Sequence, residues 1–99
     1  MNKKIVVQTQ EEFTEMAANH DVRISEACVE SILKNLNTKK RHIHILEVII
    51  EEEDRIFDIT CDRNDFIETL EKNLIIMEEH ERYEKCSEIV KALKILKSK

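Results

Sequence analysis

Apolar residues in the last third of the chain recur every three or four positions, which is the spacing of one helical face. Residues 66–77 carry one such stripe, residues 83–96 carry a second, and the polar residues 78–82 lie between them. Two amphipathic helices joined by a short polar connection pack antiparallel. The pattern therefore predicts a helical hairpin over about residues 64–98.

Two further helices are expected near the N-terminus. Thr9, followed three positions later by Glu12, fits a capping box and predicts a helix over residues 10–19. Ser25 is a good N-cap for a second helix that continues to about residue 36. A short β-branched run precedes both helices, so residues 4–8 could add an edge strand.

Between the helical segments the period changes to that of β-strands. β-Branched residues dominate residues 41–51, and residues 55–61 alternate between two faces. The acidic residues 51–54 are expected to form the turn between these strands. In the first strand, apolar side chains fall on both sides of the pleat: Ile43, Ile45 and Ile49 on one side, and Leu46, Val48 and Ile50 on the other. This distribution predicts a strand that is covered on both faces for part of its length.

Together these elements predict one α+β domain over residues 1–99. Its order is two N-terminal helices, a two-stranded antiparallel hairpin and a C-terminal helical hairpin. The possible edge strand would be added to this sheet. A chain of 99 residues is long enough for one core but not for two.

The composition narrows the class of protein. Apolar residues make up 41% of the chain, which is ordinary for a folded domain, although 37% of the residues are charged. No apolar run is long enough to span a membrane and no signal segment opens the chain, so we expect a cytoplasmic protein without membrane contact. The three cysteines, Cys28, Cys61 and Cys86, lack metal-binding spacing and fall in apolar patterns, which indicates buried thiols.

The chain contains neither glycine nor proline. Helix ends and turns must therefore use Asn, Asp, Lys or His, the residues that best replace glycine there. Phosphate-binding loops, dinucleotide fingerprints and nucleophile elbows are excluded, because each of them needs glycine. We expect a protein that is not an enzyme and carries no cofactor.

The predicted helical hairpin resembles a known motif. Residues 70–96 are similar to the UVR motif of bacterial excision-repair proteins and of some protease-adaptor systems. Tyr83 and the following Glu84 and Lys85 stand where that motif has an aromatic residue followed by Glu, and Cys86-Ser87 fill its pair of small residues. The resemblance covers roughly a quarter of the chain. It implies a helical hairpin that mates with another hairpin, and it does not imply DNA repair.

The hairpin also carries more apolar surface than a small domain needs for its own core. Ile75 and Ile76 widen the apolar arc of its first helix, and Ile95 widens that of the second. We therefore expect this surface to bind another protein or a second copy of the chain, as accessory and phage-encoded proteins do when they attach to a larger machine. The expected contact residues are Ile75, Ile76, Glu78, Glu79, Glu81, Tyr83, Val90 and Ile95. The three glutamates among them are suited to pair with a basic partner or to mimic phosphate groups.

The alternative hypothesis is a winged-helix-like DNA-binding transcription regulator. The order helix, helix, strand hairpin fits that class. However, Glu26 and Glu30 near the start of the recognition helix, the acidic wing at residues 51–54 and a net charge of −5 would all repel DNA. DNA is therefore the less favoured partner. Its cationic contacts would be Lys39, Lys40 and Arg41, with His42 and His44 beside them.

The predicted strands also carry a candidate metal site. His42 and His44 share one strand face at the spacing of two ligands, and Asp58 or Asp62 could supply a third. Polar residues alternate on any half-exposed sheet, and acidic residues at a strand-to-helix junction more often cap the helix. No metal ligands are assigned on this pattern.

Overall fold

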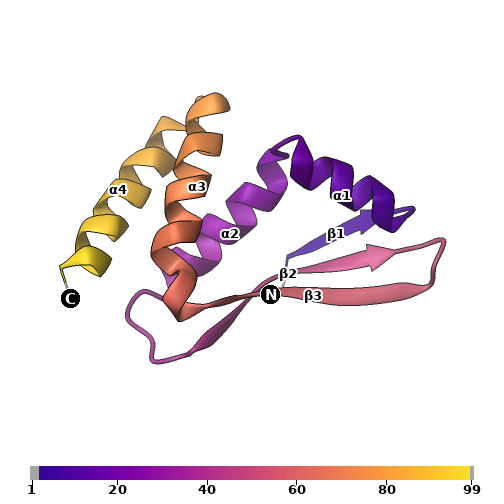
Figure 1. Ribbon diagram of the computed structural model, residues 1–99, viewed down its shortest axis with the longest axis horizontal. Coiled ribbons are helices and arrows are strands. Elements are labelled where there is room, and N and C mark those ends of the chain that lie inside the picture. Colours follow the sequence, from indigo (N-terminus) through magenta and orange to yellow (C-terminus); the bar gives the residue numbers. More distant parts are fainter. Residues whose placement is uncertain (1–2, 99) are drawn as a thin grey trace.

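Three strands form a single sheet in the computed structural model, which describes residues 3–98 (Figure 1). The strands are β1 (Lys4–Val7), β2 (His42–Ile50) and β3 (Arg55–Asp62). The central strand β2 pairs in parallel with β1 and antiparallel with β3. Both the predicted β-hairpin and the additional N-terminal edge strand are confirmed.

The helices cover one face of this sheet and extend beyond it at one end (Figure 1). Their bounds are Gln10–Ala18 (α1), Val22–Lys34 (α2), Phe66–Glu79 (α3) and Tyr83–Lys97 (α4), and a 3-10 turn, η1 (Arg63–Asp65), precedes α3. The predicted α+β class with a C-terminal helical hairpin is confirmed. Within residues 3–98, no helix has both the length and the apolar character needed to cross a bilayer.

The core runs from the inner face of the sheet, which α2 covers, into the contacts of α2 with α3 and α4. Each packed element contributes completely buried side chains, such as Val48 of β2, Val29 of α2, Leu70 of α3 and Ile89 of α4. Burying an aliphatic side chain of this size is worth about 1.5–3 kcal/mol. α2 is the central helix, because it contacts the sheet, α3 and α4. Of its 13 residues only Arg23 and Lys34 are exposed.

A β-bulge in β2 corrects the predicted two-sided strand. His44 pairs with Thr60 and Leu46 pairs with Ile59, so Ile45 is an extra residue. One extra residue shifts the alternation of side chains by one position. Five apolar residues before and after the bulge therefore reach the helical side, where they are buried: Ile43, Ile45, Leu46, Val48 and Ile50. Ile49 is on the open face and is half-buried. The predicted cover on both faces is wrong.

α2 begins earlier than the sequence suggests. Asp21 is its N-cap, and the Oδ1 atom of Asp21 accepts a hydrogen bond from the Arg23 main-chain N–H at 2.9 Å. Ser25 instead lies within the helix and is buried against α3. The prediction that Ser25 caps this helix is wrong, because Asp21 offers an equally good cap one turn earlier.

Turns without glycine are made by residues in the left-handed region. His20, Asp54 and Glu81 have φ values of 55°, 48° and 57°. His20 and Asp54 belong to the residue types expected there, whereas Glu81 does not. A side chain with a Cβ atom is strained in this region, so each of these turns costs the fold some stability.

Candidate interaction surfaces

The α3–α4 hairpin closes over a tight three-residue connection. The main-chain N–H of Arg82 donates to the Met77 carbonyl at 2.9 Å, and Glu81 supplies the left-handed residue. At the open end, Lys97 Nζ lies 3.0 Å from Glu71 Oε2 and links the two helices. The fold-back that the sequence predicts at residues 78–82 is therefore where the structure has it.

Most of the predicted contact residues lie at the surface. Four large apolar side chains of the hairpin are exposed: Ile75 (60%), Tyr83 (65%), Val90 (41%) and Ile95 (47%). Ile76 is half-buried, and Glu78, Glu79 and Glu81 are exposed. Within the second stripe, Ile89 is buried and Val90 is exposed.

These apolar residues do not share one face. Tyr83, Val90 and Lys97 are spaced by seven residues, so they follow one line along α4, and Lys97 marks that line as the side next to Glu71 of α3. Ile75 is one turn after Glu71 on α3 and belongs to the same side. We call the surface formed by Ile75, Tyr83 and Val90 the hairpin face.

Ile95 lies outside the hairpin face. It is five positions from Val90, which is about 140° around a helix. Its neighbour one heptad earlier is Glu88, which pairs with Lys85 at 3.3 Å, and Lys85 also approaches Glu30 of α2 at 3.9 Å. Ile95 is therefore on the α2 side of α4.

Glu79 at the hairpin tip already has a partner within the chain. Its Oε2 atom lies 2.9 Å from His20 Nδ1 at the corner between α1 and α2. His80 Nε2 donates to the His20 carbonyl at 2.8 Å. The tip is thus fixed to the N-terminal helices, and Glu78 and Glu81 are the two predicted glutamates that have no ion pair among residues 3–98.

The basic residues of the DNA hypothesis lie on the loop between α2 and β2. Lys39, Lys40 and Arg41 are all exposed, and Arg41 Nε is 3.9 Å from Asp62. The helix that would enter the major groove is α2, which is covered by the sheet, α3 and α4. This arrangement does not favour a winged helix, because a recognition helix must expose one long face.

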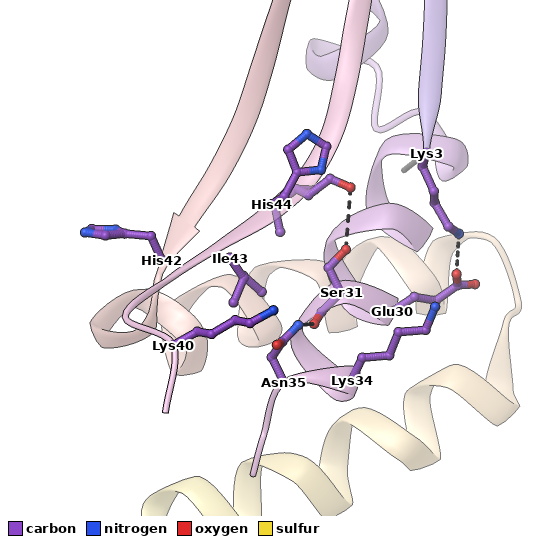
Figure 2. A pocket seen from close by; sticks show the side chains of 10 residues that line it. Lys3, Glu30, Ser31, Lys34, Asn35, Lys40, His42, Ile43 and His44 are labelled. Atoms are coloured by element: carbon purple, nitrogen blue, oxygen red, sulfur yellow. Dashed lines mark hydrogen bonds and ion pairs between the residues drawn. The ribbon is translucent and has the colours of Figure 1, made fainter. Parts of the chain in front are cut away.

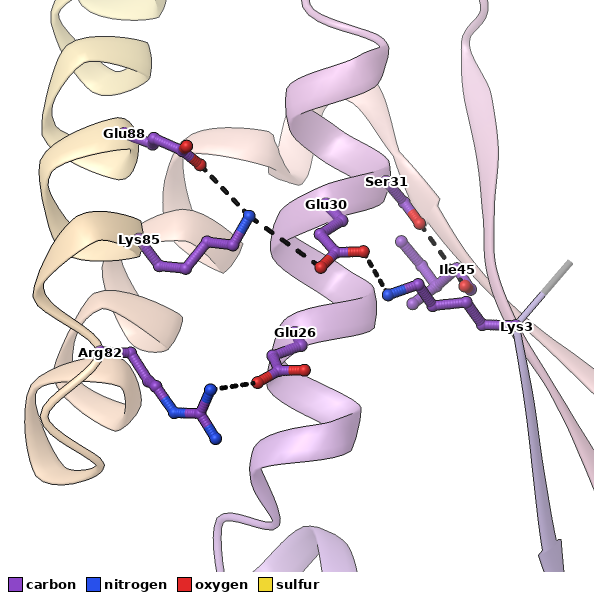
Figure 3. A network of polar contacts seen from close by, with 8 residues as sticks. All are labelled: Lys3, Glu26, Glu30, Ser31, Ile45, Arg82, Lys85 and Glu88. Carbon is purple, nitrogen blue, oxygen red and sulfur yellow. Dashed lines mark hydrogen bonds and ion pairs between the residues drawn. The ribbon is translucent and has the colours of Figure 1, made fainter. Parts of the chain in front are cut away.

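A network of ion pairs joins the hairpin to the rest of the molecule (Figure 3). Glu30 at the middle of this network bonds Lys3 before β1 and approaches Lys85 of α4. Arg82 reaches Glu26 of α2 at 3.2 Å. The hydrogen bond from Lys3 and the nearby lysine charges hold the pKa of the Glu30 carboxyl below its usual value. Sequence reasoning missed this network, since its partners are far apart along the chain.

The two histidines of the candidate metal site contact different carboxylates. His44 Nε2 lies 2.9 Å from Asp58 Oδ1, whereas His42 Nδ1 lies 3.4 Å from Asp62 Oδ2. In the part of the chain that the structure describes, no three His, Cys, Asp or Glu side chains are grouped as metal ligands. The two histidines instead form cross-strand polar contacts on the open side of the sheet.

The three cysteines are free and half-buried, somewhat less buried than expected. Burial raises the pKa of the Cys28 thiol to about 11, and burial also raises the pKa of Cys61 and of Cys86. A thiol with a raised pKa carries little thiolate at neutral pH. These side chains are therefore poor nucleophiles.

Comparisons with known proteins give no relative. No protein-family model matches the chain. No curated protein and no solved structure matches it.

Proposed function

We propose that this protein is a non-enzymatic binding module that docks on a helical surface of a larger protein through its hairpin face. The observation that carries the proposal is the exposure of Ile75, Tyr83 and Val90 on one side of a packed helix pair. Exposed apolar groups on a well-packed scaffold lose little entropy on binding and gain from being removed from water. Tyrosine is also enriched among residues that dominate binding energy.

The distribution of exposed apolar residues supports this side of the molecule. Among residues 3–98, the two exposed large apolar side chains outside the hairpin, Val6 and Ile56, lie on the open face of the sheet. That face also carries charged neighbours, and Lys4 there is 3.9 Å from Glu47. Four exposed large apolar side chains belong to the hairpin, Ile75, Tyr83, Val90 and Ile95, so its apolar contribution to the described surface is the larger.

The charges around the hairpin face define the chemistry of the partner. Glu78 lies beside Ile75 on the α3 side, and Lys94 lies beside Val90 on the α4 side. Glu71 and Lys97 pair with each other between the two helices. A partner helix that matches the hairpin face would carry an apolar stripe with basic residues along one border and acidic residues along the other. The resemblance to the UVR motif predicts the same kind of partner, a second helical hairpin.

We place this activity in the cytoplasm, where thiols are kept reduced. The three free cysteines support that location. Nothing in the proposal requires catalysis, and the raised thiol pKa values argue against nucleophilic chemistry at Cys28, Cys61 or Cys86.

The test compares two surfaces of the same protein. Ile75→Glu and Val90→Glu place a charge on the hairpin face. Ile56→Glu places the same charge on the sheet, at a position that is more exposed (65%) than Ile75 (60%) or Val90 (41%). Wild type and Ile56→Glu should retain one specific protein from an extract of the source cell, and both hairpin variants should lose it. Circular dichroism should show that all variants remain folded.

Two results would count against the proposal. One is retention of the same protein by both hairpin variants, and the other is its loss from Ile56→Glu to the same extent. Light scattering of the purified protein identifies a second copy as the partner if the mass is that of a dimer for wild type and of a monomer for Ile75→Glu.

A further inference from the structure

A cavity of about 540 Å³ opens between the C-terminal half of α2, the first residues of β2 and the loop that joins them (Figure 2). Lys3, Lys34 and Lys40 line this cavity from three different segments. Glu30 is the acidic residue in its wall. A cavity of this size can hold a small ligand of several functional groups.

The lysines of this cavity differ in whether they have an ion-pair partner. Lys3 bonds Glu30, and Lys85 of α4 further neutralises that carboxylate. Lys34 and Lys40 have no ion-pair partner among residues 3–98. Figure 2 shows Lys40 reaching from the loop toward Asn35, while Lys34 lies on the opposite side of the cavity near Glu30. Within the described residues, Lys40 therefore faces the cavity without a nearby carboxylate, whereas the charge of Lys34 is shared between the cavity and Glu30, which Lys3 already bonds.

The loop that presents Lys40 is held in place by Arg63. The Arg63 guanidinium donates to the Lys40 carbonyl at 2.7 Å, to the Asn35 carbonyl at 2.8 Å and to Thr38 Oγ1 at 2.9 Å. The same guanidinium lies over the Phe66 ring, 4.9 Å from its centroid. Because the loop is already ordered, a ligand does not have to supply the cost of ordering it.

The strand at the back of the cavity offers uncharged donors. β1 pairs with β2 only over Glu47–Ile50, so residues 42–46 have no strand neighbour on that side within residues 3–98. Such an edge presents main-chain N–H groups. Ser31 Oγ, which makes only a long contact of 3.5 Å with the Ile45 carbonyl, lies between the two unpaired lysines.

We propose that this cavity binds a small phosphate ester, with Lys34 and Lys40 on either side of the phosphate group. Two cations together with neutral N–H and O–H donors match the double negative charge and multiple acceptor oxygens of a phosphate monoester. The remaining volume accommodates the organic part of the ligand. This site is on another surface than the hairpin face and does not depend on its function.

Inorganic pyrophosphate is the probe for the first test, because it presents the phosphate groups without an organic part. In amide NMR spectra at low ionic strength, pyrophosphate should cause saturable shifts at Ser31, Asn35, Lys40 and Ile43–Ile45. Lys34→Gln and Lys40→Gln should each weaken binding about tenfold, since each removes one charge-assisted hydrogen bond. Lys91→Gln is the matched control, because Lys91 is also exposed but lies on α4. The control should leave the affinity unchanged.

Other results would overturn the assignment. Shifts that do not saturate, or an equal loss of affinity in Lys91→Gln, would show that pyrophosphate senses only the general charge of the surface. A short DNA duplex that binds more tightly than pyrophosphate through the same two lysines would replace the small ligand with a nucleic-acid backbone.

Discussion

Ser25 Oγ donates a hydrogen bond to Asn73 Oδ1 at 2.6 Å, inside the contact between α2 and α3. Both side chains are buried, and the Asn73 amide also donates to the Thr69 carbonyl at 2.8 Å. This polar pair lies in an interface that is otherwise apolar. It fixes how the helical hairpin is placed against the central helix, because any shift between α2 and α3 would leave a buried polar group unpaired.

Removal of one partner from this pair should be more damaging than removal of both. Ser25→Ala leaves the Asn73 carbonyl oxygen buried without its donor and should cost about 1–3 kcal/mol in the free energy of unfolding. The double variant Ser25→Ala with Asn73→Leu removes both polar groups and should recover much of that loss. Urea denaturation measures both values. Ser87→Ala on the exposed side of α4 is the control and should change stability little.

The sequence does not indicate this pair, and the reason is physical. Asn73 sits in the buried stripe of α3, but its position predicts only that a partner must exist, because any buried amide needs one. The residue type of Ser25 favours a helix N-cap instead, because serine is common there. The identity of the partner depends on which helices meet, which is a property of the tertiary fold.

The periodic features were predictable and the irregular ones were not. The apolar stripes with a period of 3.6 residues predict α3 and α4, and the capping residue Thr9 predicts α1. In the structure Thr9 Oγ1 accepts a hydrogen bond from the Glu12 main-chain N–H at 3.2 Å. The bulge at Ile45 could not be predicted, because a single extra residue leaves no signal in an unbroken β-branched run. The position of Arg63 over the loop at residues 35–41 also depends on contacts between distant segments.

The network at Glu30 makes stability depend on pH. Lys3 lowers the pKa of Glu30 in the folded protein, and Arg23 lowers that of Asp21 through a side-chain hydrogen bond. A carboxyl whose folded pKa is lowered stabilises the fold above its unfolded pKa, near 4, and this stabilisation is lost as the pH falls through the folded value. Each group should contribute less than about 1 kcal/mol, because both lie near the surface.

Denaturation at pH values between 7 and 3 measures this contribution. The stability of the wild type should fall over the acidic half of that range, and the fall should be smaller in Glu30→Gln and in Asp21→Asn. Glu68→Gln is the control on an exposed i,i+4 pair of α3, and it should follow the wild type. An equal fall in all four proteins would mean that other carboxyls cause the acid sensitivity.

Glu81 at the hairpin turn offers a test of strain in a chain without glycine. Its φ of 57° is left-handed, and a residue with a Cβ atom pays roughly 1–2 kcal/mol there. Glu81→Gly should therefore raise the free energy of unfolding, by about 0.5–1 kcal/mol after the greater freedom of glycine in the unfolded chain is subtracted. Thermal and urea denaturation both measure the change.

The matched control makes the same substitution three positions later. Glu84 lies in the first turn of α4, where the backbone is helical. Glu84→Gly should therefore lower stability by about 0.5–1 kcal/mol. If both glycine variants were destabilised equally, strain at Glu81 would not explain the turn.

Cys28 should be the slowest thiol of the folded protein to react with an alkylating reagent. Burial raises its pKa to about 11, whereas a thiol in an unfolded chain has a pKa near 8.5. At pH 8 the thiolate fraction, and with it the alkylation rate, should fall roughly two orders of magnitude below that of the unfolded chain. Iodoacetamide labelling followed by peptide mass spectrometry measures the rate at each cysteine. Equal rates at Cys28 in native protein and in urea would show that this thiol is open to solvent. The same raised pKa implies that stability falls as the pH rises above the unfolded pKa, because ionisation of Cys28 then favours the unfolded state.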